Sequence, residues 1–303
     1  MFKNQSYKSY KENLDFVRSC SNWNELDRLS KNINHKFLSN SKYKSRLSLV
    51  EKKMNTILCD DSWMGHCAKY QLHSGGKRFR ALLALIAADI FKISYESAIY
   101  AAICCEFIHN ASLIHDDLQD RDLLRRGLPT IWNRFGDHTA INLGDYFIAG
   151  SFEALSKING NPENKCKAIE HLSYTIQQTV KGQSLEILER SNLNLRMEEY
   201  ESTAKAKTGG LICWPIKLVM ILNGEKNIDK INFKPLYEAG LAYQIQDDLS
   251  DFLGIKDRGL PGRDLKEGKM NVLIMHFLEI ATRGEKFLLK EFFTKKSESI
   301  SED

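Results

Sequence analysis

Proline is scarce in this sequence, and it lacks long hydrophobic runs, paired cysteine motifs and a strong charge of either sign. Only 5 of the 303 residues are proline, which favours long helices because proline breaks a helix interior. The longest apolar run, residues 81–90, is interrupted by Asp89 and is far shorter than a membrane span of about 20 residues. The net charge of +4 is too small to indicate a nucleic-acid-binding protein.

The 7 cysteines are scattered, and no C-x-x-C pair occurs among them. This usage excludes the common zinc-binding spacings and favours reduced thiols in a cytoplasmic setting. The N-terminus has early lysines and no apolar core, so it does not have the pattern of a secretory signal. Targeting to an organelle is left open.

Apolar residues recur at helical spacing from Leu47 onward. No alternating pattern lasts long enough to predict a sheet, so we expect one all-α domain over residues 47–303. Residues 1–46 are rich in Asn, Ser and Lys and are expected to form a helical or partly disordered extension. Helices are predicted at 81–91, 98–122, 142–155, 168–189, 197–206, 211–222 and 236–253. A short one is expected at 284–293, ahead of a disordered charged tail.

Two acidic clusters with the same D-D-x-x-D spacing stand near the ends of predicted helices. Residues four apart share a helix face, so the carboxylates of each cluster repel one another unless a cation is present. A single cluster is as readily a solvated helix end. However, apolar residues precede both clusters, which favours metal binding at the mouth of a helical bundle. Hard oxygen donors suit Mg²⁺ together with substrate phosphates. The clusters are Asp116-Asp117-Leu118-Gln119-Asp120 and Asp247-Asp248-Leu249-Ser250-Asp251.

Basic residues occur near both clusters. The run 75–80, Gly-Gly-Lys-Arg-Phe-Arg, combines flexible backbone with three cations, and glycine lets the main chain approach a phosphate. Arg125 and Arg126 follow the first cluster, while Lys207 and Lys269 lie further along. Any one of these groups alone is more often a solvated surface charge. Together they supply enough positive charge for two diphosphates.

Seven blocks in a fixed order resemble the trans-polyprenyl diphosphate synthase family over residues 47–274. The resemblance implies an all-α fold of long antiparallel helices around a central cavity, in a homodimer. It also implies Mg²⁺-dependent head-to-tail condensation of isopentenyl diphosphate with an allylic diphosphate, with about three ions per site. The blocks are GGKRFR (75–80), EFIHNASLIHDDLQDRDLLRRGLPT (106–130), AINLGDYFIAGSFE (140–153), GQSLEI (182–187), KTGGLI (207–212), YQIQDDLSD (243–251) and GRDLKEGK (262–269).

The resemblance also implies a role for individual residues. The Mg²⁺ ions would be bound by Asp116, Asp117, Asp120, Asp247 and Asp251, with Asp248 also in the catalytic set. The allylic diphosphate would be held by Arg125, Lys207, Gln244 and Lys269, and isopentenyl diphosphate by Lys77, Arg80, His109 and Arg126. The oxygen dipoles of Thr208 and Gln244 would stabilise the allylic cation.

Product length is expected to depend on the helix turn before the first cluster. Ala111 and Ser112 are small, whereas relatives that stop at farnesyl often carry an aromatic residue there. We therefore predict geranylgeranyl diphosphate (C20), with longer or shorter products as the alternatives. Phe107 and Ile108, one turn further down, are candidates for a deeper floor.

The resemblance has departures, and they leave two other functions open. Leu260 stands where many relatives have a lysine, Asn271 replaces a frequent threonine, and few residues follow Lys269. A terpene synthase derived from the family would not need isopentenyl diphosphate, yet the cations for that substrate are present. A non-catalytic partner subunit commonly loses aspartates, yet both clusters are retained here.

Overall fold

The computed structural model describes residues 41–254 and 262–300, with side chains through residue 294. The chain divides into two compact units, Met1–Ser48 and Leu49–Asp303, and the site described below lies in the second. Leu260 and most of the predicted N-terminal extension lie outside the described residues. The assigned roles of those segments therefore stay predictions.

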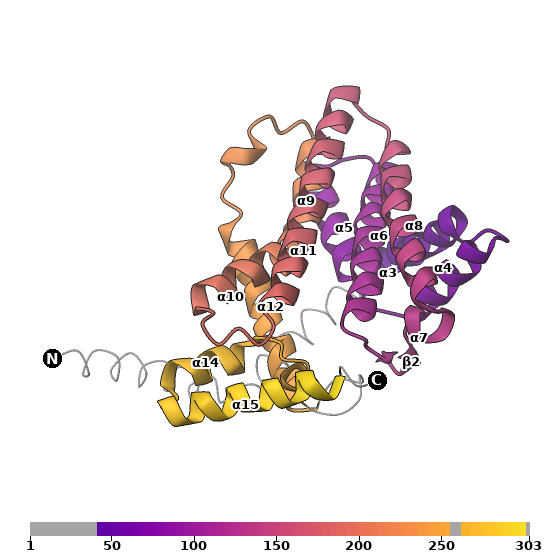
Figure 1. Ribbon diagram of the computed structural model, residues 1–303. Helices are drawn as coiled ribbons and strands as arrows, with labels where there is room; N and C mark the ends of the chain where they lie inside the picture. The colour runs from indigo at the N-terminus through magenta and orange to yellow at the C-terminus, as the bar shows by residue number, and fades with distance from the viewer. Residues whose placement is uncertain (1–40, 255–261, 301–303) are drawn as a thin grey trace. The chain divides into compact units, whose positions relative to one another are not determined.

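The described part of the chain is almost entirely helical, so the predicted all-α class is confirmed (Figure 1). Strand structure among these residues is limited to a hairpin of β1 (Leu124–Arg125) and β2 (Leu128–Pro129). A π-helical turn, Lys205–Gly209, connects two of the helices. The helices are α3 (Ser41–Leu58), α4 (Trp63–His73), α5 (Phe79–Phe91), α6 (Tyr95–Gln119), α7 (Ile131–Phe135), α8 (Asp137–Ser156), α9 (Pro162–Leu188), α10 (Met197–Ala204), α11 (Gly210–Leu222), α12 (Lys234–Phe252), α13 (Arg263–Lys266), α14 (Val272–Ile280) and α15 (Arg283–Ile300).

Helix α6 is the centre of the larger core and packs against α5, α8 and α11. Its Phe107 meets Phe147 of α8 edge to face, with ring centroids 5.6 Å apart. Within the described ranges, α6 alone is long and apolar enough to pass a membrane-span test. However, 78% of its most apolar window is buried inside the protein, as expected of a core helix.

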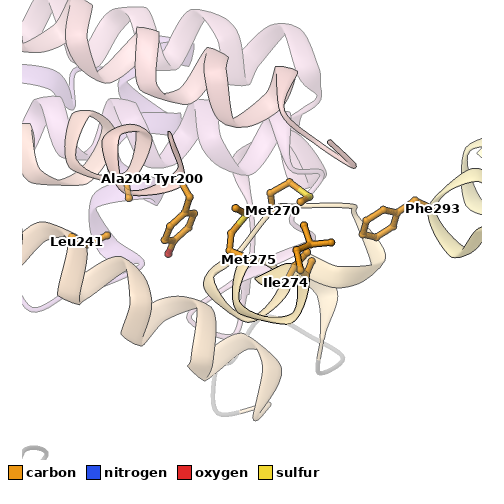
Figure 2. Packing of buried hydrophobic residues seen from close by; sticks show 8 residues of the cluster. Tyr200, Ala204, Leu241, Met270, Ile274, Met275 and Phe293 are labelled. Atoms are coloured by element: carbon orange, nitrogen blue, oxygen red, sulfur yellow. The ribbon is translucent and has the colours of Figure 1, made fainter. Parts of the chain in front are cut away.

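A second hydrophobic cluster joins helices from the C-terminal half (Figure 2). It links α10 and α12 to α14 and α15 through side chains that expose less than a tenth of their surface. The members are Tyr200, Ala204, Leu241, Met270, Ile274, Met275, Leu278 and Phe293. This cluster supports the helix that carries the second aspartate cluster, so packing here bears directly on the site.

Helix ends follow local side-chain chemistry. Ser62 and Ser94 accept hydrogen bonds from backbone N–H groups in the first turns of α4 and α6, which satisfies donors that lack helical partners. Asn161 caps α9, with Pro162 in the first turn. Helix α5 is preceded instead by Arg78, whose backbone is left-handed with φ 47° and whose side chain makes no capping hydrogen bond. The residues before α5 are therefore held in a tight loop rather than in a continuing helix.

The C-terminal region differs from the sequence prediction. Two helices follow Lys269 instead of one short helix, and α15 continues past residue 293 to Ile300. Asn271, noted above only as a departure, caps α14 by accepting a hydrogen bond from the Ile274 N–H at 3.1 Å. Lysine and glutamate are good helix formers, so the charged residues after 293 extend the helix. The prediction of a disordered tail was wrong through residue 300.

Candidate active site

The first acidic cluster sits at the C-terminal end of α6, where the helix dipole already disfavours negative charge. The following hairpin turns Arg125 back onto Asp117, where Arg125 Nε lies 2.7 Å from Oδ1 and 2.8 Å from Oδ2. Both side chains are buried. Burial raises the pKa of Asp117 to about 6, and the Arg125 charge opposes that rise. Arg125, predicted to hold a diphosphate, therefore neutralises a predicted metal ligand here.

Lys207 pairs with Asp116 in the same way. Lys207 Nζ lies 3.0 Å from Asp116 Oδ1 and 2.9 Å from Glu186 Oε2. Burial opposes ionisation of Asp116, but Lys207, Lys269 and Arg125 outweigh it and hold its pKa below the usual value. Lys207 belongs to the π-helical turn, a distortion that often marks functional sites. The turn projects this lysine toward the end of α6.

Asp120 contacts two cations from different parts of the chain. Arg190, just past α9, pairs with one carboxylate oxygen, and Lys269 pairs with the other. Arg263 of α13 contacts Asp122 and donates to the backbone carbonyl of Asp120 at 2.8 Å. Burial, and then the charge of Asp116, raise the pKa of Asp120 to about 6. The fold thus brings Lys269 into contact with Asp120, although the two residues are 149 positions apart in the sequence.

The carboxylates fit a divalent cation by donor type. The charge of Asp116 raises the pKa of Asp120, and Lys207 links Asp116 to Glu186. In the ranges 41–254 and 262–300, no three His, Cys, Asp or Glu side chains are arranged as a ready metal-binding group. A Mg²⁺ ion here would displace lysine and arginine and complete its shell with phosphate and water oxygens.

The three carboxylates of the second cluster, on α12, differ in burial and in their hydrogen bonds. Asp248 is buried and accepts hydrogen bonds from Tyr200 Oη at 2.7 Å, Gln244 Nε2 at 2.9 Å and the Val272 N–H at 3.0 Å. Asp251 is buried too, and its Oδ2 accepts from the Asp264 N–H at 3.0 Å. Asp247 is half-buried. Two of the three carboxylates therefore connect α12 to the segments that follow it.

The glycine-rich loop before α5 lies against the hairpin. Gly76 has φ 131°, and a Cβ at this position would stand 2.9 Å from the guanidinium of Arg126. Arg126 donates to the Gly75 carbonyl. Lys77 is exposed, whereas Arg78 is buried and bonds to the Leu72 carbonyl at 2.8 Å. The structure thus gives Arg78 a role in supporting the fold and leaves Lys77 exposed.

His109 and Arg80 leave polar atoms without partners. His109 Nδ1 and Arg80 Nε are buried and make no hydrogen bond within the described structure. Burial, and next the charge of Arg80, hold the pKa of His109 well below its usual value. Arg125, Arg126 and Arg78 add positive charge around the same imidazole. An anion would satisfy an unpartnered guanidinium N–H beside several cations, and the isopentenyl diphosphate site stays a prediction.

The structure brings Thr208 and Gln244 together, and their predicted role at the allylic cation stays a prediction. Thr208 Oγ1 donates to Gln244 Oε1 at 3.1 Å. Helix α9 packs closely against the π-helical turn. A Cβ atom at Gly182 would lie only 2.8 Å from the backbone nitrogen of Lys207. Both amide atoms of the adjacent Gln183 are buried without partners.

Several residues of the site had no role in the sequence prediction. Glu186 and Gln183 belong to the quoted block GQSLEI, which was the available signal. Tyr200 and Arg190 lie outside the quoted blocks and contact the clusters only through the tertiary fold, whereas Arg263 belongs to the block GRDLKEGK and was a candidate substitute for the lysine that Leu260 replaces.

The proposed chain-length residues lie on α6. Ala111 is buried, and half-buried Ser112 donates to the His109 carbonyl at 2.8 Å. Phe107 and Ile108 are buried one turn earlier. Their effect on product length, and the predicted central cavity, stay predictions.

The polyprenyl synthetase family model matches residues 61–302. This all-α fold carries two aspartate clusters, and lysine and arginine side chains pair with the first. The chain belongs to the polyprenyl synthetase family and is a trans-prenyltransferase that acts as a prenyl diphosphate synthase.

Named relatives support this membership. A geranylgeranyl pyrophosphate synthase from Geoglobus acetivorans is 33% identical over 80% of this chain and 78% of its own length. Heptaprenyl diphosphate synthase component 2 from Bacillus subtilis is 32% identical over 77% of this chain and 67% of its own length.

Solved structures agree on the fold. Geranylgeranyl pyrophosphate synthetase from Pyrococcus horikoshii Ot3 matches with a TM-score of 0.72 and 26% identity, covering 88% of this chain and 84% of that one. A polyprenyl synthase from Caulobacter crescentus CB15, complexed with calcium and isoprenyl diphosphate, matches with a TM-score of 0.69. It is 22% identical and covers 87% of this chain and 84% of that one.

Proposed function

We propose that this chain condenses isopentenyl diphosphate head to tail with an allylic diphosphate in a Mg²⁺-dependent reaction, giving geranylgeranyl diphosphate (C20). One observation carries the proposal: one set of cations contacts the first aspartate cluster, and a second set, which shares Arg125 with the first, surrounds His109 on the same helix. Lys207, Lys269 and Arg125 contact its carboxylates. The second set, around His109, has buried nitrogen atoms without partners. Two anionic substrates need two such sets.

Asp116, Asp117 and Asp120 are proposed to hold the metal from one side, and Asp247 and Asp251 from the other. A divalent cation, when bound, supplies charge that stabilises a departing pyrophosphate. The Caulobacter relative, complexed with calcium and isoprenyl diphosphate, supports a divalent cation in this chain as well. The choice of Mg²⁺ and the number of about three ions follow the resemblance and the preference of Mg²⁺ for carboxylate and phosphate oxygens.

The chain's own residues then bind and orient the reactants. Lys207 and Lys269, released from Asp116 and Asp120, would turn to the allylic diphosphate, with Arg125 beside them. The allylic C–O bond breaks with its electron pair leaving on pyrophosphate. The double bond of isopentenyl diphosphate attacks the resulting cation, and a proton passes to the released pyrophosphate. Thr208 and Gln244 present side-chain oxygens to the cation, and no protein nucleophile is needed.

The C20 product rests on the small residues Ala111 and Ser112 and on several relatives named geranylgeranyl diphosphate synthase. The test incubates the purified chain with Mg²⁺, farnesyl diphosphate and labelled isopentenyl diphosphate, followed by chromatography of the dephosphorylated products. We expect one C5 addition to dominate. A product series that extends well beyond C20 would replace the proposal with a longer-chain synthase. If shorter primers give C15 as the longest product, the small-floor argument fails.

Two other functions are separated by the same assay. Pyrophosphate release without any need for isopentenyl diphosphate would indicate a terpene synthase. No turnover by the isolated chain would favour a subunit of a heteromeric synthase, and the similarity to a protein named component 2 gives that alternative a specific basis. Addition of a candidate partner chain would then restore turnover.

We also propose a homodimer in a reducing, cytoplasmic compartment. Exposed apolar side chains follow the outer face of α9, including Tyr174, Val180, Leu185 and Leu188, and a second copy would cover them. The six cysteines in the described residues are all free thiols, which suits a reducing environment. Light scattering during size-exclusion chromatography tests the dimer, for which twice the monomer mass is expected.

A further inference from the structure

The ring of Tyr200 belongs to an apolar cluster, and its hydroxyl is a polar group bonded to Asp248. Tyr200 is 7% exposed and packs with Ala204 and Met275 between α10 and α14 (Figure 2). Packing alone would be served by phenylalanine. A buried hydroxyl needs a partner, and this one donates to Asp248 Oδ2 at 2.7 Å.

Asp248 uses both of its oxygens within the protein. Oδ2 also accepts from the Val272 N–H at 3.0 Å, and Oδ1 accepts from Gln244 Nε2 at 2.9 Å. An ionised carboxylate only accepts hydrogen bonds. Gln244 accordingly turns its NH₂ group toward Asp248, the orientation that an ionised Asp248 requires.

That orientation fixes the other end of the amide. With Nε2 committed to Asp248, Gln244 Oε1 faces Thr208, whose hydroxyl donates to it at 3.1 Å. Thr208 lies in the π-helical turn, next to Lys207, which contacts Asp116. A continuous chain of hydrogen bonds thus links the Tyr200 hydroxyl, through Asp248 and Gln244, to the Thr208 hydroxyl.

We propose that Tyr200 is a positioning residue for the prenyl transfer step. Through Asp248 it holds the amide of Gln244, and through Gln244 the hydroxyl of Thr208, in the orientation that the chemistry requires. The inference rests on the proposed function, in which those two oxygens face the allylic cation. Without the tyrosine hydroxyl, the Asp248 carboxylate loses one of its three anchors and the amide gains freedom to rotate.

The first test is Tyr200→Phe, which keeps the ring in the cluster and removes only the hydroxyl. We expect kcat to fall about tenfold, the size of effect of one hydrogen bond to a charged group. The KM for isopentenyl diphosphate and the affinity for pyrophosphate should change less than twofold, because the cations that bind them are untouched. An unchanged kcat would overturn the proposal.

A matched control separates positioning from stability. Ile274→Val removes one methylene group from the same cluster and replaces none of the side chains that form the chain of hydrogen bonds. Ile274→Val should lower the thermal unfolding midpoint about as much as Tyr200→Phe does, while its kcat stays within twofold of wild type. Equal losses of kcat in the two variants would show that Tyr200 acts through packing alone, and the proposal would fail.

A readout independent of turnover completes the test. With selectively ¹⁵N-labelled glutamine, the side-chain amide of Gln244 should exchange its hydrogens at least tenfold faster in Tyr200→Phe than in wild type and in Ile274→Val. Equal exchange rates would refute the positioning role. An inactive wild-type chain with the expected exchange difference would contradict the proposed function and leave the linkage between Tyr200 and Gln244 established.

Discussion

Lys207 donates a hydrogen bond to Asp116 at 3.0 Å, although 91 residues separate them in the sequence. The same relationship recurs around the first cluster, where Arg125 pairs with Asp117 and Lys269 with Asp120. Groups predicted to bind the diphosphate thus neutralise groups predicted to bind the metal. On ligand binding, the cations of this network would exchange their carboxylate partners for the diphosphate, and the carboxylates would exchange their cation partners for the metal. Each buried charge would therefore keep a partner of opposite sign.

Asp116→Ala is expected to lower kcat by about 100-fold or more, because it removes a proposed metal ligand and leaves Lys207 without a main partner. Steady-state turnover with farnesyl diphosphate measures the effect, and circular dichroism checks the fold. The matched control is Asp137→Ala, which breaks an exposed pair with Arg121, a kind of contact that contributes about 0–1 kcal/mol. Near-normal turnover of Asp116→Ala would refute the assignment of this cluster.

The affinity for Mg²⁺ should weaken as pH falls through about 6, because burial and Asp116 raise the pKa of Asp120 to about 6. Above that pH the carboxylate is ionised and ready to bind, and below it the metal must displace a proton. The expected loss approaches tenfold per pH unit for one proton released. Calorimetric titration of Mg²⁺ with pyrophosphate from pH 7.5 to 5 measures it. Asp120→Asn should bind more weakly with a flatter profile; a steep profile in that variant would assign the proton elsewhere.

Ser112→Phe is expected to shorten the product from C20 to C15. Ser112 is half-buried on α6, one turn before Asp116, where an aromatic ring would block a chain growing beneath the cluster. Product chromatography with a short allylic primer gives the outcome, and total C5 incorporation should fall by less than tenfold. If the variant still makes C20 as its main product, the growing chain does not pass Ser112.

Gly240→Ala should reduce both stability and turnover. A Cβ at Gly240 would lie 2.4 Å from the Gly209 Cα, so α12 and the π-helical turn would be forced apart. Overpacking of this kind costs about 1–3 kcal/mol, which thermal unfolding would detect. The comparison is Gly284→Ala on α15, where the added methyl meets nothing within 4 Å. There we expect a gain of about 0.5–1 kcal/mol and no change in turnover.

Sequence patterns predicted most helices of the larger unit well, because apolar periodicity is a local signal. The same reasoning missed α14, whose cap at Asn271 is a single residue, and it ended α15 too early. For the site, the motifs located the carboxylates and cations. They gave no indication that Arg78 turns inward or that Arg190 reaches Asp120.

The sequence by itself determined the chemistry available to this protein: two aspartate clusters at helix ends, cations at fixed offsets, and small residues before the first cluster. Those features depend only on residue type and on spacing within one helix, and both can be read from the amino-acid sequence. Only the tertiary structure decided which cation meets which carboxylate, and it turned Asp248 toward Tyr200 and the Val272 N–H. Such pairings depend on how distant helices pack, and no spacing within one helix encodes that.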